Sequence, residues 1–137
     1  MDGVILTPLK KISQPNGDIF HAMKVSDKSF FGFGEAYFTS VKQDKIKGWK
    51  KHTEMTLNLI VAVGKIQFAI YNNKSFFSVT LSKDNHQRLT VAPGLWVAFK
   101  GLSVENIALN LSNIEHDPNE SINQDLNSFH FDWSKTK

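Results

Sequence analysis

Turn-forming residues interrupt the chain at short intervals over most of its length. The stretches PNGD, YNNK, SKDN and APG separate segments that are either apolar or alternate between apolar and polar residues. Gly, Pro, Asn and Asp favour turns, and short alternating segments between turns are typical of β-strands. Because no convincing helix lies among them, these segments favour an all-β sandwich or barrel, in particular a jelly roll. The expected strands are residues 4–12, 18–25, 33–41, 46–52, 55–63, 65–72, 75–82, 86–92, 95–102 and 106–112.

The segment 55–63 predicts which side chains face the interior. Side chains alternate along a strand, so Leu57 and Leu59 share one face while Asn58 points to the other. Both faces are partly apolar near the end of the segment, which indicates a central strand. Gly64 separates this segment from the next apolar strand and predicts a tight hairpin.

The chain is expected to form a single domain over residues 1–137, with one sizeable core. Hydrophobic residues make up 41% of it, including 11 Phe, which is a globular composition. The strand pattern fades near the end, so residues 113–137 are expected to be irregular and to pack on the barrel. Within them, HDPNESINQDLNSF predicts one helical turn and FHFDW one last short strand.

Composition indicates where the protein is expected to act and which classes of ligand it is expected to bind. With no cysteine, no apolar run of about 18 residues and no recognisable signal peptide, the chain is expected to be cytoplasmic and without a membrane partner. Nucleic-acid-binding surfaces usually carry several arginines along a broad stripe, and Arg88 is the only arginine. The lysines gather instead within residues 42–51, where they suit a small anion such as a diphosphate. Alternatively, they are a solvated strand edge protected against pairing.

Several ordered stretches from about residue 18 onward resemble the RmlC-like cupins, specifically the sugar-nucleotide branch with its WxcM-like members. KGWKKHTEMTLNLIVAVGKIQFAIYN is similar to a Gly–aromatic–His–x–His stretch and the two strands that follow it. RLTVAPGLWVAFKGLS is similar to a Pro–x–Gly–Leu–Trp–His–x–Phe turn, and FGEAYFTSV to a ketoisomerase strand that carries a tyrosine. HDPNE and FDW resemble motifs near the end of the epimerases. The resemblance implies a cupin jelly roll (double-stranded β-helix), a homodimer, and dTDP-4-dehydrorhamnose 3,5-epimerase or dTDP-sugar 3,4-ketoisomerase chemistry.

The chain departs from that pattern at two histidine positions. In the branch, the first histidine of His–x–His removes a proton next to a 4-keto group, and here that position is Lys50. The second histidine is retained as His52, and Val97 stands where many relatives have another histidine. Two missing ligands make a metal site unexpected, so neither a metal nor another cofactor is predicted. The base is then either His52 or Lys50, the latter if burial and neighbouring lysines depress its pKa, with Tyr37 as acid or hydrogen-bond partner.

Other candidate site residues have both a structural and a functional interpretation. His52 and Tyr37 alone would be ordinary core residues, although alternation places Lys50 and His52 on one strand face. The candidate substrate-binding residues are Lys47 for a diphosphate, Trp49 and Trp96 for stacking on the ligand, and Asn58 and Asn110, which need polar partners if buried.

These observations predict a metal-independent isomerase or epimerase of a nucleotide-linked 4-keto-6-deoxy sugar in surface polysaccharide biosynthesis. It would act by abstracting a proton next to the ketone. The alternative is a non-catalytic cupin that binds a sugar nucleotide or carbohydrate, with Lys50 in place of the usual base. A third interpretation is a purely structural partner of another biosynthetic enzyme.

Overall fold

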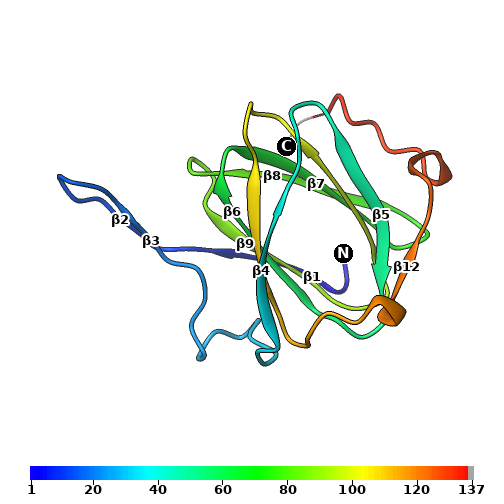
Figure 1. The fold of residues 1–137 in the computed structure, drawn as a ribbon, viewed down its shortest axis with the longest axis horizontal. Coiled ribbons are helices and arrows are strands. Elements are labelled where there is room, and N and C mark those ends of the chain that lie inside the picture. The colour runs from blue at the N-terminus through cyan, green and yellow to red at the C-terminus, as the bar shows by residue number, and fades with distance from the viewer. Residues whose placement is uncertain (136–137) are drawn as a thin grey trace.

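Two five-stranded antiparallel sheets face each other and enclose one interior, which confirms the predicted jelly roll (Figure 1). The structure is a computed structural model and describes residues 1–135. The first sheet contains, in spatial order, β1 (Val4–Pro8), β9 (Gln87–Val91), β6 (Leu57–Val63), β11 (Ile107–Ser112) and β4 (Glu35–Ser40). The second contains β12 (Ser121–Asn123), β5 (Ile46–His52), β10 (Trp96–Gly101), β7 (Lys65–Tyr71) and β8 (Phe76–Ser82).

A small hairpin projects from the body formed by these two sheets. It consists of β2 (Lys11–Ile12) and β3 (Ile19–Phe20), which pair with each other and with no other strand of the described residues. The expected strand 4–12 is therefore divided, and the expected strand 18–25 is reduced to two residues. Pro8 ends β1 because proline has no N–H with which to continue a ladder.

Apolar side chains from the inner faces of both sheets form the core. Leu57, Leu59 and Val61 of β6 meet Phe68 and Ile70 of β7 in one buried cluster. Asn58 lies on the opposite face of β6, as the alternation predicts, and it is 2% exposed there. Regular alternation therefore places Leu57 and Leu59 on the inner face of β6, where they line the interior between the sheets, and Asn58 on its outer face.

The predicted hairpin at Gly64 is wrong. β6 and β7 lie in different sheets, and Gly64 is the corner at which the chain crosses from one sheet to the other. Gly64 has φ of 81°, and a Cβ added there would lie 2.0 Å from the carbonyl oxygen of Glu105. Only glycine combines this conformation with so close an approach of two backbones.

The C-terminal segment packs along the outside of the second sheet. Figure 1 shows it in orange and red beside β5. It contains two short 3₁₀ helices, η1 (Pro118–Glu120) and η2 (Leu126–Ser128), and between them β12, which pairs with β5. No helix in the described part of the chain is long and apolar enough to cross a membrane.

The predicted strand FHFDW is wrong, because the backbone of this stretch pairs with no strand in the described residues. Its aromatic side chains instead pack on the outer face of the second sheet. Phe129 lies 5.5 Å from Trp49 and 5.2 Å from Trp96 between ring centroids, and Trp133 lies 6.3 Å from Trp49. Buried aromatic area therefore holds this segment in place of a hydrogen-bond ladder.

Candidate active site

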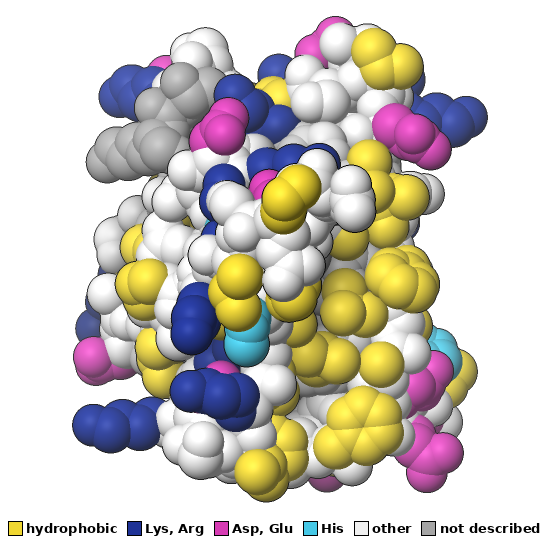
Figure 2. All heavy atoms as spheres, turned by 90° about the vertical axis from the view of Figure 1, so that its left-hand side faces the viewer, with side chains coloured by type: hydrophobic (Ala, Val, Ile, Leu, Met, Phe, Trp, Pro, Cys, Tyr) yellow, Lys and Arg dark blue, Asp and Glu magenta, His cyan; other side chains and the backbone are white. Residues whose placement is uncertain are grey.

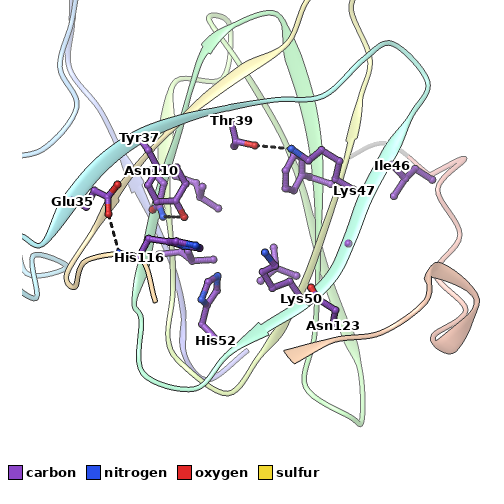
Figure 3. A pocket seen from close by; sticks show the side chains of 15 residues that line it. Glu35, Tyr37, Thr39, Ile46, Lys47, Lys50, His52, Asn110, His116 and Asn123 are labelled. Atoms are coloured by element: carbon purple, nitrogen blue, oxygen red, sulfur yellow. Dashed lines mark hydrogen bonds between the residues drawn. The ribbon is translucent and has the colours of Figure 1, made fainter. Parts of the chain in front are cut away.

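A cavity of about 670 Å³ opens between the two sheets (Figure 3). Its floor is the apolar core, and its polar side chains come from β4, β5, β11 and the segments that follow β11. This volume is in the range of small-molecule sites. The lining residues are Glu35, Tyr37, Thr39, Ile46, Lys47, Gly48, Lys50, His52, Leu57, Leu59, Val97, Phe99, Asn110, His116 and Asn123.

A bulge in β5 determines which of its lysines face the cavity. Lys47 pairs with Phe99 of β10 and Lys50 pairs with Val97, so two residues of β5 lie opposite the single residue between. An extra residue in one strand shifts the alternation of its side chains. Lys47 and Lys50 therefore both line the cavity although they are three positions apart, and His52 joins them, two positions beyond Lys50.

His52 is held by a buried carboxylate from the far end of the chain. Its Nδ1 makes a short hydrogen bond to Oε1 of Glu120, and the side chains are 11% and 3% exposed. The other carboxylate oxygen of Glu120 accepts the backbone N–H groups of Glu54 at 3.1 Å and Met55 at 3.0 Å. Because Nδ1 is engaged, Nε2 is the ring nitrogen that remains available to the cavity.

Two opposing effects act on the Glu120 carboxyl. Burial raises its pKa, but the hydrogen bond from His52 and the backbone N–H bonds from Met55 and Glu54 outweigh burial. The net result is a pKa below the ordinary value, so Glu120 is ionised near neutral pH. An ionised acceptor favours a proton on Nδ1 of His52, which leaves a lone pair on Nε2.

Tyr37 faces the cavity from β4, on the opposite sheet. Its hydroxyl accepts a hydrogen bond from Asn110 Nδ2 at 2.9 Å and donates toward Met55 Sδ at 3.9 Å. Burial raises the pKa of Tyr37, only partly offset by the bond from Asn110, so it is a neutral phenol. Asn110 is itself fixed, because its Oδ1 accepts the backbone N–H of Asn58 at 2.9 Å.

The two lysines of the cavity differ in their contacts. Lys47 reaches across to β4, where its Nζ donates to Thr39 Oγ1 at 3.0 Å and to the carbonyl of Ser40 at 3.1 Å. Lys50 is exposed to solvent at the cavity wall. The burial on which the expectation of Lys50 as a base depended is therefore absent.

Five of the eight predicted site residues meet in this cavity, and three do not. Tyr37, Lys47, Lys50, His52 and Asn110 all line it. Trp49 and Trp96 lie in the aromatic cluster on the outer face of the second sheet, and Trp49 donates its indole N–H to the carbonyl of Leu126. The side chain of Asn58 lies outside the first sheet, where Arg88 and Thr90 donate to its oxygen. Alternation placed Asn58 correctly on the face opposite Leu57, which is not the cavity face, and Trp49 and Trp96 fill apolar positions on the outer face of the second sheet.

Several polar residues of the site were not predicted from the sequence, among them Glu120, Glu35 and His116. Glu120 had a weak signal in the HDPNE motif, but nothing local connected it with His52, 68 positions away. Glu35 and His116 also line the cavity, and the Glu35 carboxylate accepts the backbone N–H of His116 at 2.9 Å. In the residues that the structure describes, no three His, Cys, Asp or Glu side chains cluster in a way that could hold a metal ion.

Comparisons with known proteins agree with this architecture. The family described as "WxcM-like, C-terminal" (FdtA) matches residues 2–132. A dTDP sugar isomerase from Desulfovibrio desulfuricans is 28% identical, with a TM-score of 0.91 over 99% of this chain and 94% of that one. A search of curated proteins finds no match.

More distant structures share the fold alone. QdtA, a sugar 3,4-ketoisomerase from Thermoanaerobacterium thermosaccharolyticum, is 20% identical, with a TM-score of 0.79 over 89% of this chain and 88% of that one. NovW, a 4-keto-6-deoxy sugar epimerase from Streptomyces spheroides, is 13% identical, with a TM-score of 0.81 over 89% and 69%. The family match covers nearly the whole chain, so the chain belongs to the FdtA family of WxcM-like C-terminal domains.

Proposed function

We propose that this protein isomerises a nucleotide-linked 4-keto-6-deoxy sugar, beginning with removal of a proton from the carbon next to the ketone. The observation that carries the proposal is the buried His52–Glu120 pair, which presents Nε2 of His52 to a cavity of suitable size. A neutral imidazole whose other nitrogen is bound to a carboxylate is a well-oriented general base near neutral pH.

The groups around His52 match the charge that develops when the proton leaves. Removing it converts the ketone into an enolate, whose oxygen needs hydrogen-bond donors or positive charge. Tyr37 supplies a neutral phenol from the opposite sheet, and the Lys50 ammonium lies two residues from the base on the same strand face. We assign Lys50 to this electrostatic role and His52 to the base.

The diphosphate of the ligand would lie against Lys47. Its Nζ already donates to two oxygens of β4, so its position is fixed before a ligand arrives and little side-chain entropy is lost on binding. The backbone N–H of Asn58 holds Asn110 in place, and Asn110 in turn donates to the hydroxyl of Tyr37. Asn110 would thereby orient this hydroxyl so that it donates to the sugar.

The relatives support this substrate class. The 28% identical structure is named a dTDP sugar isomerase. A variant of QdtA was crystallised with TDP-4-keto-6-deoxyglucose, and although 20% identity carries the fold alone, its ligand defines the first compound to test.

Hydrogen exchange tests the proposal. The protein is incubated with dTDP-4-keto-6-deoxyglucose in deuterated buffer, and the sugar C3 and C5 protons are followed by NMR. We expect the C3 signal to decay faster than in the enzyme-free control, and His52→Asn to abolish the difference. Exchange that persists in His52→Asn would remove His52 as the base, and no exchange with the native protein would remove the reaction.

A second candidate is a cupin that binds a sugar nucleotide without transforming it. The exposed Lys50, at the position where the family pattern has a histidine, is the observation that favours it. This candidate predicts broadening of the ligand signals on addition of protein and no exchange at any sugar carbon, so the same NMR experiment separates the two functions.

We further propose a homodimer that acts in the cytoplasm and supplies sugars for surface polysaccharide, as the resemblance implies. Figure 2 shows hydrophobic side chains gathered along one flank of the molecule. In or just before β4, an edge strand of the first sheet, Phe33 is 65% exposed and Phe38 is 70% exposed. Such apolar exposure is typical of an interface, and sedimentation velocity of the native protein and of Phe38→Ser would test the dimer.

A further inference from the structure

The cavity contains a second histidine that does not come from the strand motif. His116 lies between β11 and η1, outside the lysine-rich strand, and it lines the cavity together with His52. In Figure 3 its ring projects into the cavity between Tyr37 and His52. Although Lys50 replaces the first histidine of the strand motif, His116 brings a second histidine into the same cavity from the segment between β11 and η1.

The segment that carries His116 is held at both ends. The backbone N–H of His116 donates to Glu35 of β4 at 2.9 Å. Four residues later, Glu120 is anchored to His52 and to the backbone of Glu54 and Met55. Asp117 caps η1 by accepting the N–H of Asn119 at 3.0 Å. One short segment therefore positions His116 directly and His52 through Glu120.

The chemistry of the proposed reaction needs two kinds of proton transfer. Moving a ketone from C4 to C3 transfers a proton between the two carbons, and it also removes the O3 proton and adds one to O4. While the enediol is present, His52 is protonated, either with the C3 proton or with one exchanged from solvent, so it cannot also accept the O3 proton. A second group that both donates and accepts near neutral pH is required.

We propose that His116 is this second group and carries the proton between O4 and O3, a role that rests on the isomerase function proposed above. His52 takes the C3 proton, and the C3–H electron pair forms the C3=C4 double bond. O4 takes a proton from the His116 imidazolium, which gives the enediol and neutral His116. His116 then accepts the O3 proton as C3=O forms, and C4 takes the proton from His52. Both histidines return to their starting states, and no external oxidant or reductant is needed.

Tyr37, the other candidate for this shuttle, is less suited to it. Its hydroxyl is already bound by Asn110, and burial raises its pKa, which makes the phenolate harder to form. A histidine gains and loses a proton readily in the physiological range. Tyr37 is therefore a hydrogen-bond donor to the sugar, whereas His116 exchanges protons with it.

The test separates exchange at carbon from net conversion. Using the full-length protein with dTDP-4-keto-6-deoxyglucose in deuterated buffer, NMR measures loss of the C3 proton and formation of the 3-keto product in the same sample. For His116→Asn and His116→Gln we expect exchange within about 3-fold of the native rate and conversion slower by about 10²-fold. His52→Asn should lose both. His130→Asn, an exposed histidine outside the cavity, is the matched control and should change neither.

Each other outcome is decisive. An equal loss of exchange and conversion in both His116 variants, or a change in KM alone, would overturn the shuttle and make His116 a binding residue. Unchanged conversion in the His116 variants would show that His116 has no role in the reaction. A native protein that shows neither exchange nor conversion would instead refute the isomerase function itself, and this inference with it. Thermal unfolding of each variant shows whether a loss reflects chemistry or folding.

Discussion

Replacement of Glu120 by Gln tests whether the carboxylate sets the proton position on His52. The Glu120 carboxylate accepts three hydrogen bonds, from His52 Nδ1 and from the backbone of Glu54 and Met55. A glutamine can keep its oxygen on the two backbone N–H groups and turn its NH₂ toward His52. Nδ1 of His52 must then accept, so the proton moves to Nε2 and the cavity loses its base.

The expected effects on activity and stability differ greatly in size. In the analogous serine-protease triad, a carboxylate-to-amide change that forces the wrong histidine tautomer lowers turnover by about 10⁴-fold, and we expect a loss of C3 exchange of about 10³-fold or more here. Hydrogen bonds to charged groups are worth about 1.5–3 kcal/mol and neutral ones about 1. Loss of the charge should therefore lower the free energy of unfolding by only about 1–3 kcal/mol.

The pH dependence of stability gives an independent measurement. The folded-state pKa of Glu120 is lowered, so its ionised form stabilises the fold above the unfolded pKa of about 4.3. That contribution disappears as the pH falls through the folded pKa. Denaturant unfolding between neutral pH and pH 3 should show the native protein converging toward Glu120→Gln in acid.

Glu54→Gln is the matched control, because Glu54 contacts the site only through its backbone N–H. Exchange of the sugar proton by NMR, and ¹⁵N chemical shifts of the His52 ring, provide the readouts. If Glu120→Gln keeps exchange within about 3-fold of the native rate, or the His52 ring shifts keep the native tautomer, the assignment of Glu120 fails.

Substitutions at three further residues test other parts of the site and fold. Tyr37→Phe removes the hydroxyl that Asn110 contacts, so we expect turnover to fall by about 10²-fold with a stability loss near 1 kcal/mol; equal turnover by NMR would remove Tyr37 from the chemistry. Lys50→Met should slow C3 exchange by about 10-fold or more whereas Lys50→Arg retains most of it, because the role is a positive charge; similar rates for the two variants would contradict this. Arg88 is fully buried and binds Asp27, Ser29 and the carbonyl of Ala22. Arg88→Met should therefore lower the free energy of unfolding by about 3 kcal/mol and speed proteolysis of residues 21–30. A denaturant titration measures the first effect and limited trypsin digestion the second, and an unchanged result in both would refute the reasoning.

Local pattern was sufficient for most strands and for one wall of the cavity. Turn chemistry and alternation identified β5, β6 and β10, and alternation on β5 placed Lys50 beside His52. The same reasoning placed Asn58 correctly on the face opposite Leu57, although it was still proposed as a ligand contact. Local pattern did not distinguish a sugar-binding tryptophan from one that fills an apolar cluster. Trp49 and Trp96 were predicted to stack on the ligand, but they lie in the cluster on the outer face of the second sheet.

The sequence by itself determined that the chain is a β-jelly roll with lysines and a histidine along one strand, because side-chain period and turn preference depend only on neighbouring residues. Tertiary structure alone decided which sheet each strand joins, and it turned Gly64 from a hairpin into a crossing point between sheets. It also brought Glu120 onto His52 and His116 into the same cavity. These pairings join distant parts of the chain, and they depend on how the two sheets pack and how the C-terminal segment wraps, which no local periodicity encodes.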